Sequence, residues 1–286
     1  MKRNRFAIAA AILIATAATI SAQPATRFGE GTHLVGTDIQ PGVYRTEGEV
    51  RYFARLSGVS GEFGDIIANE TPDDGPVLVE IKEGDVAFES NGDGEWYLLD
   101  DSYQPEQQTS FGPGWWLVGK DIKPGLYRSE VGISYHERLS GVGGELGDIL
   151  ANEAFSDGPI VVEIKSGDVA FHSSGEGYWS IVDDSYRPEL RTLFGDGFWI
   201  VGVDIMPGLY QTTDDVSYYA RLSGFGGQLG DIIANEAGAS GRSTIEIKAT
   251  DVGFQTQGGA TWSRVDTSPT LVRSATWGHV KSQLSR

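Results

Sequence analysis

Short apolar runs alternate with polar residues along this chain, and Gly, Pro, Asn and Asp interrupt them. In the run RYFARLS at 51–57, Tyr52, Ala54 and Leu56 fall on one face and the residues between them on the other, which is the period of a β-strand. Strands of this kind are predicted to start from His33, Val43, Arg51, Asp65, Pro76, Asp85 and Glu95. Seven short strands without a helical period predict a small antiparallel β-sandwich or barrel.

The same pattern occurs three times at a fixed interval of 83 residues. The motif VGTDIQPGVYRTE at 35–47 returns as VGKDIKPGLYRSE at 118–130 and as VGVDIMPGLYQTT at 201–213. A unit of this length has the size of a small domain, which favours three tandem domains over the alternative of a short solenoid or propeller. The sequence therefore predicts an all-β protein of three antiparallel β-sandwich or barrel-like domains of 83 residues each. They are repeat 1 (28–110), repeat 2 (111–193) and repeat 3 (194–276), and a short tail (277–286) follows them.

The first 22 residues have the composition of a secretory signal peptide. Lys2, Arg3 and Arg5 precede an apolar run at 6–20, and small residues lead up to Ala22. This run is shorter than the roughly 20 residues that a membrane-spanning helix needs. We therefore expect cleavage near Ala22 and a secreted or periplasmic protein without a membrane span.

Composition narrows the classes of partner. The chain has no cysteine, so it forms no disulfide and offers no thiol for lipid attachment or metal binding. Its formal net charge is −18, which repels nucleic acid and favours cationic partners, calcium among them. The loop NGDGE at 91–95 has a faint likeness to a calcium loop, but its acidic residues do not recur in the other copies, so a hairpin turn is the preferred interpretation.

Residues able to support catalysis are scarce. His33, His136 and His172 each stand where the other two copies have a different residue type, so we interpret them as packing or surface residues. The carboxylates common to all copies are Asp38, Asp65, Glu70, Glu80, Asp85 and Asp100 with their counterparts, and we assign them structural roles. One carboxylate per copy is expected to pair with Arg55, Arg138 or Arg221 across the strands. We predict no catalytic residue, no cofactor and no metal site, and an enzyme such as a hydrolase is the least favoured class.

The aromatic residues give the better functional indication. Trp96, Trp179 and Trp262 recur at one position and are predicted to be core residues. Trp115–Trp116 and Phe198–Trp199 are adjacent pairs, and adjacent residues of a strand point to opposite faces. We therefore expect one ring of each pair to be exposed and take all four residues, Trp115, Trp116, Phe198 and Trp199, as candidate ligand-binding residues. The alternative is that these rings pack against the neighbouring copy, and the shortness of the linkers slightly favours it.

Several motifs together resemble a repeat domain of unassigned function in exported proteins and lipoproteins of bacteria. They are G-x-x-L-V-G-x-D-I-x-P-G-x-Y-R, Y-x-x-R-L-S-G, D-I-I-A-N and a D-V-x-F segment that ends at a Trp, and they cover residues 28 to about 268. The resemblance implies an exported domain and brings no catalytic residues. It also implies a disulfide between a Cys before the Tyr and a Cys before the Trp. That disulfide is absent here, because Arg51, Ser134 and Ser217 occupy the first place and Asp93, Glu176 and Gly259 the second.

From these observations we predict an exported, non-enzymatic binding protein that acts at or outside the cell envelope. Repetition of a module raises avidity when the target is itself repetitive, which favours a cell-wall or extracellular polysaccharide over an envelope protein. The alternative is a structural or adhesive spacer without a small-molecule site. Exposure of Trp115 and Phe198 would distinguish the two hypotheses.

Overall fold

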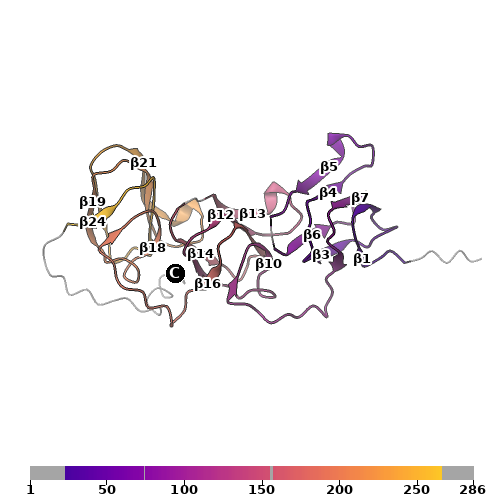
Figure 1. The fold of residues 1–286 in the computed structure, drawn as a ribbon, viewed down its shortest axis with the longest axis horizontal. Helices are drawn as coiled ribbons and strands as arrows, with labels where there is room; N and C mark the ends of the chain where they lie inside the picture. Colours follow the sequence, from indigo (N-terminus) through magenta and orange to yellow (C-terminus); the bar gives the residue numbers. More distant parts are fainter. Residues whose placement is uncertain (1–22, 74, 155–156, 266–286) are drawn as a thin grey trace, which may run out of the picture.

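The computed structural model describes residues 23–73, 75–154 and 157–265 of the 286-residue chain. The predicted signal peptide with its cleavage site and the tail 277–286 lie outside these residues. Figure 1 shows the three repeats following one another along the longest axis of the molecule. Within the described ranges every regular element is a β-strand except for three short 3₁₀ turns. These turns are η1 (Phe63–Asp65), η2 (Leu146–Asp148) and η3 (Leu229–Asp231).

Each repeat contains eight described strands. Those of repeat 1 are β1 (Arg27–Phe28), β2 (Gly31–Leu34), β3 (Gly42–Thr46), β4 (Tyr52–Leu56), β5 (Ile66–Glu70), β6 (Val77–Ile81), β7 (Ala87–Asn91) and β8 (Trp96–Leu98). Those of repeat 2, with β9 starting one residue before the predicted boundary, are β9 (Ser110–Phe111), β10 (Gly114–Leu117), β11 (Gly125–Ser129), β12 (Ile133–Leu139), β13 (Ile149–Ala154), β14 (Ile160–Ile164), β15 (Ala170–Gly175) and β16 (Trp179–Ile181). Those of repeat 3 are β17 (Leu193–Phe194), β18 (Gly197–Ile200), β19 (Gly208–Thr212), β20 (Val216–Leu222), β21 (Ile232–Ala239), β22 (Ser243–Ile247), β23 (Gly253–Gln257) and β24 (Trp262–Arg264).

The strands of a repeat form two four-stranded antiparallel sheets. Their orders are β1-β8-β3-β6 and β2-β7-β4-β5 in repeat 1, and the corresponding strands have the same orders in repeats 2 and 3. The predicted all-β fold of three tandem domains is confirmed. Seven of the eight strands are those predicted from the alternation. The eighth, β1, has only two residues, which is too short for a period to be read, and Phe28 on it pairs with Trp96 on β8.

The two sheets of a repeat pack face to face around a tryptophan. The ring of Trp96 on β8 lies 5.4 Å from that of Phe88 on β7, edge to face, and is fully buried. Its Nε1 donates a hydrogen bond of 2.8 Å to the hydroxyl of Ser90, so the buried indole N–H is satisfied. Trp179 and Trp262 are equally buried and bond to Ser173 and Thr256. The predicted core position of all three tryptophans is confirmed.

The D-I-x-P-G motif forms the turn between two strands that belong to different sheets. Asp38 closes it, because its Oδ2 accepts a hydrogen bond of 2.8 Å from the backbone N–H of Leu34. The hydroxyl of Tyr44, two residues after the glycine, donates to the carbonyl of Gln40 at 2.8 Å. Gly42 is required there, since its φ is +144° and a Cβ would lie 2.5 Å from the side chain of Leu98.

Candidate binding clefts between the repeats

Consecutive repeats are joined by a buried arginine. Arg45 on β3 of repeat 1 reaches into repeat 2, where its Nη1 donates to Oδ2 of Asp121 at 3.0 Å. Its guanidinium also lies over the rings of Tyr103 and Trp116, at 5.9 and 5.5 Å from their centroids. In repeat 2 Arg128 makes the same set of contacts with Asp204, Tyr186 and Trp199 of the junction to repeat 3. Loss of either partner would leave a buried charge unpaired.

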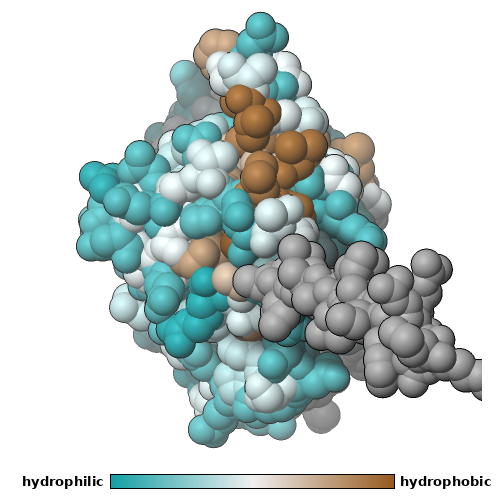
Figure 2. All heavy atoms as spheres, turned by 90° about the vertical axis from the view of Figure 1, so that its right-hand side faces the viewer, coloured by the Kyte–Doolittle hydropathy of each residue, from teal (hydrophilic) through white to brown (hydrophobic). Residues whose placement is uncertain are grey.

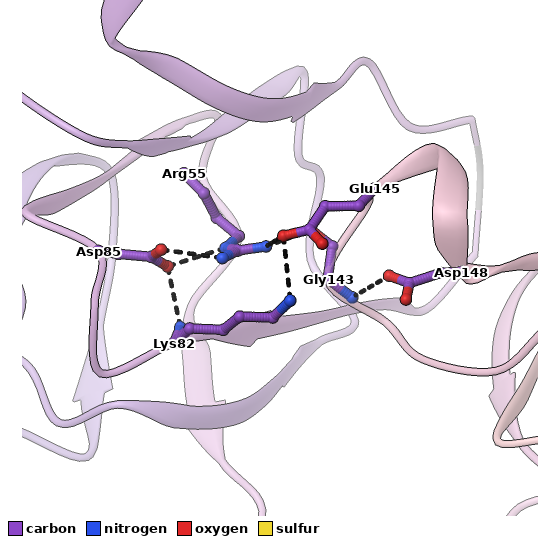
Figure 3. Close-up of polar contacts among 6 residues, drawn as sticks. All are labelled: Arg55, Lys82, Asp85, Gly143, Glu145 and Asp148. Atoms are coloured by element: carbon purple, nitrogen blue, oxygen red, sulfur yellow. Dashed lines mark hydrogen bonds and ion pairs between the residues drawn. The ribbon is translucent and has the colours of Figure 1, made fainter.

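A second arginine connects each repeat to the next. Arg55 on β4 forks onto both carboxylate oxygens of Asp85 at 2.8 Å, and its Nη1 donates to the carbonyl of Gly143 in repeat 2 at 2.7 Å (Figure 3). Glu145 of repeat 2 accepts from Arg55 and from Lys82, and hydrogen bonds from Lys82 first and then Arg55 lower the pKa of Glu145. In repeat 2 Arg138 forks onto Asp168 and donates to Gly226 in the same way, and in repeat 3 Arg221 forks onto Asp251. The predicted arginine–carboxylate pair is confirmed in every copy.

The backbones of adjacent repeats also bond to each other. At the first junction the N–H of Trp115 donates to the carbonyl of Pro76, and that of Glu80 donates to the carbonyl of Val142, both at 2.8 Å. At the second junction Phe198 donates to Pro159 and Glu163 to Phe225, at 2.7 and 2.8 Å. Such approach needs glycine: a Cβ on Gly75 would lie 2.3 Å from the carbonyl oxygen of Pro113. The two junctions therefore have one geometry.

The four candidate aromatic residues lie at these junctions. Trp115 and Phe198 are only 7% and 8% exposed, because the preceding repeat covers the outer face of their strands. Trp116 and Trp199 are buried as well, and their Nε1 atoms donate to the carbonyls of Gly112 and Gly195. The expectation that one ring of each pair faces solvent is therefore wrong. Ligand binding by these four residues stays a prediction.

A cleft opens beside each junction, and Trp115 or Phe198 lines it. The first cleft, between repeats 1 and 2, has a volume of about 570 Å³, and the second, between repeats 2 and 3, about 420 Å³. Most of their lining residues are equivalent, and these include Asn69, Glu70, Trp115, Tyr135 and Leu146 in the first cleft and Asn152, Glu153, Phe198, Tyr218 and Leu229 in the second. The preceding repeat supplies the amide and the carboxylate, and the following repeat supplies the rings and the leucine.

The first cleft contains a hydrogen-bonding network. The hydroxyl of Tyr135 donates to Oε2 of Glu137 at 2.8 Å, and Nδ1 of His172 lies 3.0 Å from Oε1 of the same carboxylate. The imidazole is stacked on Trp115, with 3.6 Å between ring centroids and 10° between planes. Burial alone would raise the pKa of Glu137, but the hydrogen bonds from His172 and Tyr135 outweigh it and lower that pKa. His172 is thus a buried residue of the cleft rather than a surface residue.

The second cleft has amides where the first has the imidazole. The side-chain amides of Gln255 and Gln257 each donate to Oε1 of Glu153 at 3.2 Å. Burial raises the pKa of Glu153, and these two hydrogen bonds oppose the shift. Gln255 occupies the position of His172 in the copy before it. Both clefts therefore have a carboxylate at the position of Glu70 and Glu153, but the network of the first cleft is centred on Glu137, whose counterpart in the second is Ala220.

Reasoning from the sequence missed the tyrosines and the leucines of the clefts. Leu146 and Leu229 are both 88% exposed at the start of a 3₁₀ turn, and Phe63 has the same position in repeat 1. A large apolar residue followed by glycine recurs at this position in all three copies although packing does not require it. That recurrence is the signal that could have identified the rim of the clefts.

Three all-β repeats in series, joined through buried arginines, define a tandem array of small all-β domains. The model of the Rv1352-like extracellular domain matches residues 25–97, 108–180 and 191–263, and the chain belongs to this family. No curated protein and no solved structure matches the chain. In the part of the chain that the structure describes, no helix is long and apolar enough to cross a membrane.

Proposed function

We propose that this protein is an exported, non-enzymatic binding protein that holds a repetitive polymer in its two inter-repeat clefts. The observation that carries the proposal is that equivalent residues of consecutive repeats line a cleft at both junctions. Two equivalent sites at a fixed separation act together on a polymer, because binding at one raises the effective concentration at the other. Membership of an extracellular domain family supports a place of action outside the cell, where such polymers occur.

The chemistry of the linings favours a polysaccharide. Each cleft combines an aromatic ring with hydroxyl, amide and carboxylate groups, which is the mixture that positions a small polar ligand over an apolar floor. The tyrosine hydroxyl and the asparagine amide can each donate to or accept from sugar hydroxyls. The net charge of −18 disfavours anionic polymers such as nucleic acid and supports a neutral or cationic sugar chain.

A pelleting assay with insoluble cell-wall polysaccharide tests the proposal. The test variant combines Leu146→Ala and Leu229→Ala, which removes the apolar rim of both clefts at positions where exposure makes folding insensitive. The control is Val131→Ala, because Val131 is an exposed apolar residue that lines neither of these two clefts. We expect the wild type and the control to pellet with the polysaccharide and the double variant to bind about tenfold more weakly or less. Equal binding of the double variant and the control would count against the clefts as the site.

A second candidate function is a rigid spacer. The two junctions repeat the same arginine, backbone and glycine contacts, and such a set fixes the orientation of one repeat on the next. If no polysaccharide pellets any of the proteins, the spacer becomes the preferred function. Small-angle scattering then provides its test, because a spacer keeps one maximum dimension over all solution conditions in which it is folded.

A further inference from the structure

Each junction is formed by two faces, one from each of the consecutive repeats, and one face of each kind lies at an end of the array. The leading face of a repeat is the one that contacts the repeat before it, and in repeat 2 it comprises Trp115, Asp121, Val142, Gly143 and Glu145. The trailing face contacts the repeat after it, and in repeat 1 it comprises Arg45, Arg55, Pro76, Leu78 and Glu80. Repeat 1 has a leading face and repeat 3 a trailing face that no described residue of another repeat covers.

The trailing face of repeat 3 differs from the two internal trailing faces at its contact residues. Gln211 stands where they have an arginine, Arg242 where they have a proline and Thr244 where they have a leucine or a valine. The side chain of Thr244 is exposed, and so is that of Leu209, whose counterpart Leu126 is buried. Gln211 offers a carboxylate no positive charge, and Arg242 puts a cation where the internal junctions have the ring of a proline.

The leading face of repeat 1 is altered in a smaller way. Thr32 stands where the internal faces have Trp115 or Phe198, so the ring that packs on the preceding repeat is missing. Ser60 stands where the internal faces have Gly143 and Gly226. Asp38 and Val59 are retained and exposed, although Val142, the counterpart of Val59, is buried. Figure 2 shows this end of the molecule, where hydrophobic residues gather in the upper part of the face and hydrophilic residues surround them.

The framework of a junction persists at both ends. Arg221 forks onto Asp251 at 2.7 Å, just as Arg55 forks onto Asp85, but within the described residues it donates to no carbonyl of a following repeat. Asp38 accepts the N–H of Leu34 as its counterparts do, and its carboxylate is free of the arginine that they bind. The buried ion pair and the closed turn of a junction are thus kept at the two ends, whereas Thr32, Gln211, Arg242 and Thr244 replace side chains that touch a neighbour in the internal copies.

We propose that Thr32, Gln211, Arg242 and Thr244 prevent the trailing face of one copy from docking on the leading face of a second copy, and so end the array at three repeats. A contact between these two faces is heterologous and leaves one free face at each end, so it would build an open filament. Repeat proteins end their arrays with polar outer faces for the same reason. The partner that fits these ends is thus a second copy of this chain, and the four side chains exclude it.

The experiment restores the internal residue types at the four proposed positions. The restored variant carries Thr32→Trp, Gln211→Arg, Arg242→Pro and Thr244→Val, and sedimentation velocity compares it with the wild type over a wide concentration range. We expect the wild type to sediment as one species and the restored variant to form oligomers whose mean mass rises with concentration by about twofold or more. The altered positions on the trailing face are at the surface, so folding is retained, and circular dichroism checks it.

Two further variants make the outcome specific. Asp38→Asn in the restored variant removes the charge that the new arginine at position 211 needs but keeps an oxygen for the N–H of Leu34, and we expect it to weaken assembly about tenfold. Chains restored at one end only should form complexes only when the two kinds are mixed. Assembly of the wild type, failure of the restored variant to assemble, or oligomers indifferent to Asp38→Asn would each overturn the proposal.

Discussion

Gly158 and Gly241 occupy the same position in repeats 2 and 3, but only Gly158 lies against a following repeat. Comparing the same substitution at the two glycines therefore tests how much the close backbone contact at the junction contributes to stability. Gly158 in repeat 2 has φ +81°, and a Cβ there would lie 2.1 Å from the carbonyl oxygen of Asp196 in repeat 3. Gly241, its counterpart in repeat 3, has φ +75° and nothing within 4 Å of the same Cβ. Alanine therefore meets the same backbone strain at both positions, about 1–2 kcal/mol, but a steric clash at one position only.

The clash determines the expected difference. A Cβ and a carbonyl oxygen need about 3.2 Å, so Gly158→Ala forces the two backbones apart by about 1 Å. This movement disrupts the adjacent hydrogen bond from the N–H of Phe198 to the carbonyl of Pro159 and leaves both groups buried. One unsatisfied buried pair costs about 2–4 kcal/mol. We therefore expect Gly158→Ala to destabilise the protein by that amount more than Gly241→Ala.

Hydrogen exchange locates the effect and urea unfolding measures its size. In Gly158→Ala the amide of Phe198 should exchange about 100-fold faster than in the wild type, since 1.4 kcal/mol corresponds to a factor of ten. In Gly241→Ala the same amide should keep its protection. Equal losses of stability in the two variants, with Phe198 protected in both, would refute the idea that close backbone contact holds the repeats together.

Two other substitutions test buried groups of repeat 2. Arg128→Gln leaves the buried carboxylate of Asp204 without its counter-charge and should lower the free energy of unfolding by about 3–5 kcal/mol. The control Arg27→Gln breaks an exposed ion pair and should lower it by under about 1 kcal/mol. Calorimetric unfolding of both variants checks this difference. Burial lowers the pKa of His136 to about 4. The stability that its neutral form provides is therefore fully present above the ordinary pKa of about 6.5. It is lost as the pH falls towards 4, where the free energy of unfolding should be about 3 kcal/mol lower. His136→Phe, which introduces the residue found in repeat 1, should remove this part of the acid destabilisation in melting curves at pH 7 and pH 4.5, and an unchanged pH dependence would exclude His136 as its source.

The fold could be predicted because its determinants are local and repeated. Alternation assigns seven strands, since one face of each is buried in its own repeat. Trp96 and its counterparts could be assigned to the core because a large ring at a repeated strand position needs burial. The pairing of Arg55 with a carboxylate of its own copy could also be predicted, although its further bond to Gly143 could not. That bond spans two repeats, and no periodicity within one copy reports it.

The burial of Trp115 and Phe198 could not be predicted from the alternation of apolar and polar residues. Alternation tells which face of a strand a ring is on, but it does not tell what covers that face. Here both faces of β10 and β18 are covered, the inner one by the second sheet and the outer one by the preceding repeat. The clefts depend on the same docking, because Glu153 and Phe198 come together only when repeats 2 and 3 are in contact.

Differences between the copies carry the information that their identities do not. A residue shared by all three copies serves the domain itself, as Asp38 does in closing its turn, and can serve a junction as well, as Arg55 does through its bond to Gly143. A residue type shared by two adjacent copies and replaced at one end serves a contact with a neighbour, and the side of the replacement gives its direction. Gln211 replaces the arginine on the face of repeat 3 that would contact a following repeat, and Thr32 replaces the aromatic ring on the face of repeat 1 that would contact a preceding one. A residue that differs in every copy, as His172 does, belongs to neither class, and its place in the first cleft makes it the position where the two clefts can differ in what they bind.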